Sequence, residues 1–259
     1  MTEKEINRLL QDVYRGKISL DELPVDLFLM TGKKLQQALY QGFGQTLKSK
    51  DIEAPAYELL NSLRNNAYRF SGAKTFQNIK DTQALMMDGK GYIRSFSEFL
   101  PDARKLYDIY NVNWLETEYK TTISLADSAA KWQQYEADAD TLPYLEYQAV
   151  MDDNTRPEHA SMNGILLPIN DSFWDSNIPP NGWNCRCEVL QQRSGKQTTL
   201  TPAKREELKN EVEPIFRNNP GTSKVLFKEN GKDAHPYFKV DSKHEAAKQR
   251  NFGLNIPKP

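Results

Sequence analysis

The sequence predicts an α+β protein with a largely helical N-terminal half, then a small α+β module and a polar C-terminal tail. Up to about residue 136, apolar residues recur with helical spacing between polar connections. From Tyr144 to Met151, apolar and polar residues alternate loosely, as they do in strands, and residues 164–167 and 187–190 are further strand candidates. The predicted parts are a helical domain at 1–136, the module at 137–200, a helix with a β-hairpin at 201–240 and a flexible tail at 241–259.

The first residues contain a helix-start signal. Thr2-Glu3-Lys4-Glu5 has the capping-box pattern, in which the side chains of Thr2 and Glu5 each bond to the other's backbone N–H. An apolar face then follows at helical spacing: Ile6, Leu9, Leu10 and Val13. Two roles for this helix stay open, namely packing within its own domain and docking on another protein.

Glycines divide the rest of the N-terminal half. We predict that a short apolar segment ends near Gly32, that Gly42 and Gly44 weaken the next helix, and that Gly72 ends another. The predicted helices span 33–48, 55–71, 73–87, 97–110 and 113–135, and the last is predicted to be the longest.

The C-terminal part is predicted to contain a helix, a hairpin and a tail. Pro202 begins a charged helix that runs to about Phe216. Asn230-Gly231 then separates two apolar runs at 225–227 and 236–240, a pattern that predicts a β-hairpin. Residues 241–259 are basic and polar without an apolar face, which predicts a flexible tail.

Composition excludes several classes of protein. The formal net charge of the 259 residues is −1, so the chain lacks the strongly basic field of a free-standing nucleic-acid binder. No run approaches 18 apolar residues, and the first residues lack a signal-peptide pattern, so we expect a soluble protein made in a cytoplasm. The two cysteines are one residue apart, which does not suit a disulfide framework.

The stretch from Tyr147 to Leu190 concentrates the unusual residues. It contains both cysteines, one of the three histidines, two of the four tryptophans and the Pro-Pro pair. Its ordered motif residues are Asp152, Thr155, Arg156, His159, Gly164, Pro179, Pro180, Trp183, Cys185, Arg186 and Cys187.

One interpretation of this stretch is a zinc site. Cys185 and Cys187 offer sulfur and His159 offers an imidazole nitrogen, which are the donors that zinc accepts. A fourth ligand would be Asp152, Asp171 or a water molecule. The alternative is a pair of buried thiols that act as small apolar groups, with the histidine hydrogen-bonded to a carboxylate such as Asp152.

A second interpretation is architectural. Arg156 and Arg186 are predicted either to bridge carboxylates or to cap backbone carbonyls. Residues 152–155 predict a turn that leads into a short helix with Thr155 as its cap, and Gly164 would end that helix. Pro179-Pro180 would form a rigid turn that presents Trp183.

A third interpretation is catalytic. His159 with Asp152 or Glu158 could serve as acid and base, and Cys185 with His159 could serve as a nucleophile and its base. Neither pair lies in a recognisable local signature, and no phosphate-binding glycine loop is present in the sequence. We therefore predict no confident catalytic residue.

The ordered motif, from about Tyr144 to Leu190, resembles the phage Mu F-like minor head proteins of the phage head morphogenesis family. The family often has a histidine before Cys-Arg-Cys, where this chain has Gly182-Trp183-Asn184. The resemblance implies a minor capsid protein of a tailed phage or prophage. It further implies association with the portal and a need for the protein in head morphogenesis or DNA packaging.

The resemblance also implies partners and a location. The partners would be the portal protein, major capsid or scaffold proteins and DNA, with no membrane. The helical domain at 1–136 would be the docking part, and the location would be the virion head, with the host cytoplasm during assembly. Two alternatives stay open: a nuclease, hydrolase or toxin-like enzyme centred on His159, and a DNA-binding accessory protein with Lys243, Lys248 and Arg250 as its first contacts.

Overall fold

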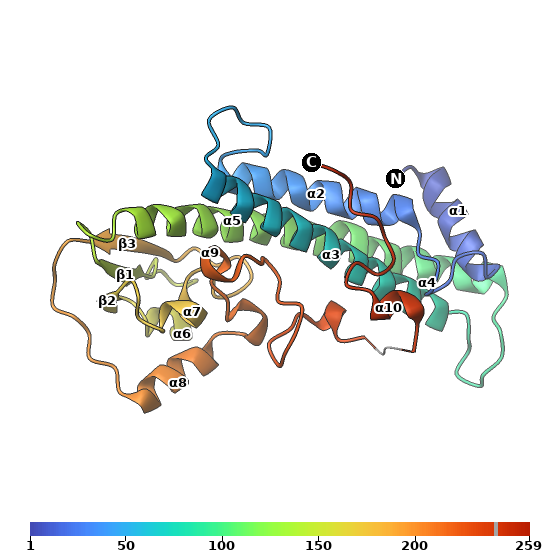
Figure 1. Cartoon of the computed structure of the whole chain (residues 1–259). Helices are drawn as coiled ribbons and strands as arrows, with labels where there is room; N and C mark the ends of the chain where they lie inside the picture. Colours follow the sequence, from blue (N-terminus) through green and yellow to red (C-terminus); the bar gives the residue numbers. More distant parts are fainter. Residues whose placement is uncertain (241–242) are drawn as a thin grey trace. The chain divides into compact units, whose positions relative to one another are not determined.

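The computed structural model describes residues 1–240 and 243–259 (Figure 1). The described residues form helices and one three-stranded antiparallel sheet, so the predicted α+β class is confirmed. They fall into two compact units, each assembled from separate segments of the chain. The first unit comprises Met1–Gln37, Asn65–Tyr119 and Pro236–Pro259, and the second comprises Ala38–Arg64 and Lys120–His235. These units differ from the four consecutive parts that the sequence predicts.

The N-terminal helices begin and end as follows: α1 spans Glu3–Tyr14, α2 Val25–Phe43, α3 Ala54–Ala84, α4 Phe96–Asp108 and α5 Leu115–Ala137, with a π-helix at Ile109–Trp114. Helix α1 has the predicted capping box between Thr2 and Glu5, and its four predicted apolar residues are buried. None of the helices in the described residues is long and apolar enough to span a membrane.

Two predicted helix breaks are wrong. Gly32 lies inside α2 and Gly72 lies inside α3. The longest helix is therefore α3, with 31 residues, and not the predicted α5, which has 23. A Cβ on Gly32 would lie 2.5 Å from the Tyr68 ring, and a Cβ on Gly72 would lie 3.2 Å from the Asn251 carbonyl oxygen. Both glycines therefore allow close packing within the first unit, and the helices continue through them because that packing outweighs their low helix propensity.

The second unit contains the sheet, with strand order β2-β1-β3. Strand β1 spans Tyr144–Gln148, β2 Leu166–Pro168 and β3 Glu188–Gln192. Leu145 lies opposite Leu167 on one side and Gln191 on the other. Alternate residues of β1, Leu145 and Tyr147, are fully buried, as the period of two in a half-buried strand requires.

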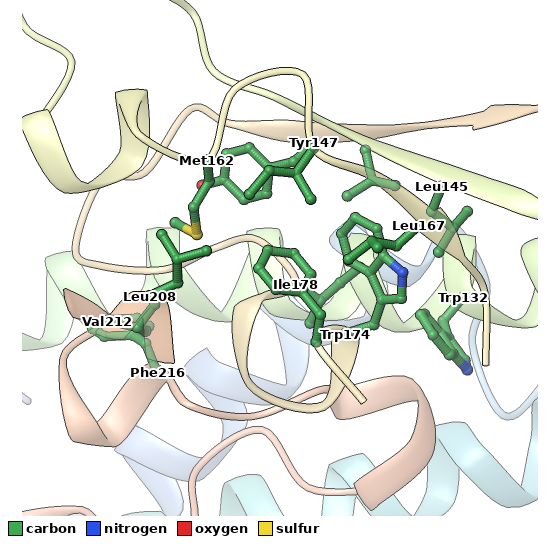
Figure 2. Close-up of a cluster of buried hydrophobic side chains, with 13 residues drawn as sticks. Trp132, Leu145, Tyr147, Met162, Leu167, Trp174, Ile178, Leu208, Val212 and Phe216 are labelled. Atoms are coloured by element: carbon green, nitrogen blue, oxygen red, sulfur yellow. The ribbon is translucent and has the colours of Figure 1, made fainter. Parts of the chain in front are cut away.

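Short helices complete the second unit: α6 spans Pro157–Ala160, α7 Trp174–Asn177, α8 Pro202–Glu211 and α9 Pro220–Ser223, with a 3₁₀ turn at Pro214–Phe216. The core beside the sheet contains Trp132, Leu145, Tyr147, Met162, Ile165, Leu167, Phe173, Trp174, Ile178, Val189, Leu208, Val212 and Phe216. Figure 2 shows side chains from the sheet, α5, α7 and α8 pointing toward one another in this core.

The predicted β-hairpin at 225–240 is wrong, because no strand forms between these described residues. Leu226 and Phe227 are neighbours in sequence and both are buried, which a half-buried strand with alternating faces does not allow. The turn around Gly231 is closed by bonds from the backbone N–H of His235 to the Lys228 carbonyl and of Ala234 to the Gly231 carbonyl. A 3₁₀ turn follows at Pro236–Phe238.

The tail also differs from the prediction. Asp241 and Ser242 lie outside the described residues. Helix α10 spans Glu245–Lys248, and buried residues from 246 onward are Ala246, Phe252 and Leu254. The ring centroid of Phe252 lies 5.6 Å from that of Phe76 on α3. The prediction of a C-terminal segment without a buried face is therefore wrong, because a few widely spaced apolar residues are enough to attach it to the first unit.

Candidate functional site

His159, Cys185 and Cys187 come together in the second unit, and we call them the His-Cys-Cys cluster. The Nδ1 atom of His159 lies 3.6 Å from the Cys185 sulfur and 3.6 Å from the Cys187 sulfur. The histidine is 4% exposed, and both cysteines are partly buried and free of disulfides. The ligand atoms of all three lie within 4.8 Å of one another. The sequence-predicted donors are therefore brought to one place.

A tight turn positions the histidine. The Asp152 carboxylate accepts hydrogen bonds from the backbone N–H of Asn154 at 3.0 Å and from the Thr155 hydroxyl at 3.1 Å. This turn leads to Pro157 at the first position of α6, which places His159 in that helix. The residue preceding the helix is Arg156, and its side chain makes no cap bond. The predicted cap by Thr155 is therefore wrong, because its hydroxyl bonds within the turn instead.

A second turn positions the cysteines. The backbone N–H of Cys185 donates to the Gly182 carbonyl at 3.2 Å, and Asn184 adopts a left-handed φ of +56° within this turn. Asparagine is among the residues that tolerate this conformation. Strand β3 starts at Glu188, directly after Cys187, so the sheet fixes the other end of the cysteine segment.

The two thiols interact with each other. Cys185 donates a hydrogen bond to the Cys187 sulfur, which lowers the pKa of Cys187 and raises the pKa of Cys185. Contact with His159 lowers the pKa of Cys187 further, while burial opposes this change. The electrostatics therefore favour one thiolate beside the imidazole, and a thiolate is the form in which cysteine binds metals.

The two arginines of the motif hold the surrounding loops. Arg186 makes a bidentate ion pair with Asp152, with both N–O distances at 2.7 Å. This hydrogen-bonded pair holds the pKa of Asp152 well below its usual range. Arg156 donates from Nη2 to the Trp183 carbonyl at 2.8 Å. One arginine thus bridges a carboxylate and the other binds a backbone carbonyl.

The carboxylates that the sequence offers as a fourth ligand are engaged elsewhere. Asp152 is bound by Arg186, and Asp171 is bound bidentately by Arg205 and accepts from the Phe173 backbone N–H at 2.9 Å. Neither belongs to the cluster of potential metal ligands found in the described residues. Asp152, which the sequence also offers as an acid–base partner of His159, is thus bonded to Arg186.

The remaining motif residues form the frame of the site. Gly164 has a φ of +78°, and its backbone N–H donates to the Tyr147 carbonyl of β1 at 2.8 Å. The Trp183 ring packs edge-to-face on Phe216, with ring centroids 5.0 Å apart. A cavity of about 400 Å³ in the second unit is lined in part by Pro179, Pro180 and both cysteines.

Sequence reasoning missed two residues that support the site. The Tyr147 hydroxyl donates to the Asn181 side-chain oxygen at 2.8 Å, and both side chains are buried. The backbone N–H of Asn181 bonds to Cys185, which lowers the pKa of Cys185 against the larger opposite effects of Cys187 and burial. Both residues lie within the motif-rich stretch, but neither has a spacing signal that points to the cysteines. Their role depends on the fold of β1 and of the proline turn.

The comparisons identify the family. The family described as phage Mu protein F like protein matches residues 33–190. The chain is 40% identical over 116 residues to putative capsid assembly protein F of Escherichia phage Mu. This matched segment covers 45% of this chain and 24% of that protein. It is 37% identical over 75 residues to the Mu-like prophage FluMu F protein of Haemophilus influenzae. That match covers 29% of this chain and 18% of the relative.

The matched segments thus span a quarter or less of these two relatives. No solved structure matches the chain. The family match begins at residue 33, far upstream of Tyr144, where the motif resemblance starts, so it includes most of α2 and all of α3. Because residues 33–190 make up more than half of the chain, the chain belongs to the phage Mu F-like protein family.

Proposed function

We propose that this chain is a minor head protein that acts in the assembly of a phage or prophage head. The observation that supports the proposal is the family match over residues 33–190, together with 40% identity to a relative named as a capsid assembly protein. The proposed location is the virion head, with the bacterial cytoplasm as the place of assembly. The proposed partner is the portal protein, and the major capsid and scaffold proteins are the alternatives.

A surface of the first unit suits such a partner. The turn between α3 and α4 is closed by a β-bridge between Met87 and Ile93. The Asp88 carboxylate fixes this turn by accepting from the backbone N–H groups of Lys90 and Tyr92 at 2.8 Å each. Met87, Tyr92 and Ile93 are 48%, 71% and 70% exposed, respectively. We call these three residues the apolar turn.

The apolar turn supports docking through protein contacts. Exposed aromatic and aliphatic side chains held by an ordered turn can fill a partner's pocket without a large loss of conformational entropy. The net charge of −1 gives no comparable support for docking on DNA. We therefore propose that the apolar turn is the docking surface of the N-terminal region. The portal protein would be the partner that binds it.

The test is co-purification of the full chain with the portal protein from the same phage genome. Tyr92→Ser with Ile93→Ser is expected to weaken binding at least tenfold. The matched control, Val25→Ser with Leu190→Ser, also removes two exposed apolar side chains, which are 55% and 43% exposed, and is expected to bind normally.

Point variants in the full chain are preferable to a truncation near residue 137. The second unit includes Ala38–Arg64 and the part of α5 from Lys120 onward, and Trp132 of α5 belongs to its core. A truncation would therefore disrupt the fold along with any docking surface. If the chain binds a capsid or scaffold protein and not the portal, the proposed partner is wrong and that protein replaces it. No binding to any of these head proteins would overturn the proposal.

A further inference from the structure

The His-Cys-Cys cluster has no role in the docking proposal. We propose that it binds one zinc ion through His159 Nδ1 and the sulfur atoms of Cys185 and Cys187, with a water molecule as the fourth ligand. The inference rests on the separation of the donor atoms, on the hydrogen-bonding capacity of imidazole and on the size of the adjacent cavity.

The distances match a tetrahedral zinc site. Zinc lies about 2.3 Å from cysteine sulfur and about 2.0–2.1 Å from histidine nitrogen. At the tetrahedral angle, these bond lengths place sulfur and nitrogen about 3.6 Å apart. Both sulfur atoms lie 3.6 Å from His159 Nδ1. The three donors therefore already have the spacing of two edges of a zinc tetrahedron.

The imidazole cannot hydrogen-bond both sulfur atoms through Nδ1, although the bond between the two thiols engages the second one. A neutral imidazole nitrogen has either one proton or one lone pair, so Nδ1 makes one good hydrogen bond. Here two sulfur atoms are equidistant from the same Nδ1. A metal ion between the three atoms satisfies both sulfurs at once.

The fourth position has room for a water molecule. A cavity of about 20 Å³ is lined in part by the three cluster residues, and the side chains of Arg156 and Arg186 also border it. A cavity of roughly 10–15 Å³ or more can hold one water molecule. The nearby carboxylate of Asp152 is bound by Arg186, so it does not fill this position. A three-residue zinc site with water as its fourth ligand therefore fits the available space.

The donor set selects the kind of metal. Two thiolates and an imidazole are soft and borderline ligands that suit zinc, whereas magnesium and calcium prefer oxygen ligands. Two thiolates balance the charge of Zn²⁺, so the occupied site has no net charge. Metal binding to a site that still holds a thiol proton releases that proton to solvent.

The ion would join segments that are distant in sequence. His159 lies on α6, and Cys185 and Cys187 lie in the segment before β3. The connection between them contains one three-residue strand, β2, and the four-residue helix α7. Zinc would thus join distant parts of a loop-rich segment of the second unit, and the water would leave one exchangeable position on the ion.

The test measures zinc in the purified full chain by elemental analysis after dialysis. We expect about one zinc per chain, and we expect Cys185→Ser with Cys187→Ser to retain less than a tenth of it. The control is Asp153→Asn, which removes an exposed carboxylate from the same loop and is expected to keep zinc. Zinc retained in the double variant would overturn the proposed ligand set.

A second measurement does not depend on whether the variants fold. Cobalt(II) added to the metal-free wild-type chain is expected to give the visible bands of a tetrahedral ion and a near-ultraviolet thiolate-to-cobalt band. Zinc is expected to slow alkylation of both cysteines by iodoacetamide at least tenfold. A chain that takes up neither metal, or whose thiols react equally fast with and without zinc, has no such site. Neither result depends on portal binding.

Discussion

Lys74 and Glu118 form an ion pair inside the first unit, with side chains only 2% and 4% exposed. The Tyr237 hydroxyl donates to the other oxygen of Glu118 at 3.2 Å, and the Lys74 ammonium lies 5.9 Å from the centre of the Tyr237 ring. Burial lowers the pKa of Lys74 and raises the pKa of Glu118, while their mutual attraction opposes both changes. The pair therefore connects α3, α5 and the C-terminal segment through charges that have little access to water.

Removing one partner of this pair is expected to destabilise the protein strongly. Glu118→Leu leaves the Lys74 charge buried without compensation, which typically costs about 3–5 kcal/mol. Lys74→Met with Glu118→Leu removes both charges and is expected to recover most of that loss. Urea unfolding of the wild type, both single variants and the double variant measures the coupling. Losses that simply add in the double variant would contradict the expected coupling.

The Asp171–Arg205 pair is expected to make stability depend on pH. Burial raises the pKa of Asp171, but the bonds from Arg205 and the Phe173 N–H outweigh burial, so its pKa lies below the ordinary value of 3.8. A lowered carboxyl pKa adds stability that is present above the unfolded-state pKa and is lost as pH falls through the folded-state pKa.

The measurement is the free energy of unfolding between about pH 6 and pH 2, in a range that brackets the ordinary aspartate pKa. Asp171→Asn is expected to lower stability at pH 6 and to flatten its decline below about pH 4. Asp153→Asn, an exposed carboxylate in the same unit, is the control and is expected to leave the curve unchanged. A wild-type slope retained in Asp171→Asn would assign the pH dependence to other groups.

Glycines inside helices give a third prediction. Alanine favours a helix by about 1 kcal/mol over glycine, yet Gly32→Ala is expected to destabilise the protein by about 1–3 kcal/mol because its Cβ would overlap the Tyr68 ring. Gly42→Ala is expected to be worse, since its Cβ would meet the backbone carbonyl of Ile123, which cannot rotate away. Gly89→Ala is the control, because no atom lies within 4 Å of that Cβ. Thermal unfolding ranks the three, and an equal effect at all three would contradict the packing argument.

The same glycines show what the sequence could not predict. The apolar face and capping box of α1 depend on residues within one turn of each other, so local pattern located them correctly. Whether Gly32 and Gly72 end a helix depends on Tyr68 and Asn251, which are distant in sequence. The C-terminal segment failed in the same way, because Phe252 is buried against Phe76 and has no regular apolar neighbours of its own.

The candidate site was predictable in its donors but not in its geometry. Their sulfur and imidazole groups were enough to predict His159, Cys185 and Cys187 as one set of metal ligands. The fold brings these three residues together. Local sequence could not show that Asp152 forms an ion pair with Arg186, because the two residues lie at opposite ends of the motif. Nor could it show that Tyr147 supports the site, since that requires the register of β1 against its neighbours.

Metal removal gives the last prediction. A ligand that binds only the folded state stabilises it by RT ln(1 + [L]/Kd), about 2.7 kcal/mol when free zinc is one hundred times its dissociation constant. Excess chelator is therefore expected to lower the melting temperature of the wild-type chain, and added zinc is expected to restore it. The variant Cys185→Ser with Cys187→Ser should start near the melting temperature of the chelated wild type and respond to neither treatment. A chelator effect of equal size in wild type and variant would place the responsible metal elsewhere, whereas an effect confined to the wild type attributes the stabilisation to the cluster.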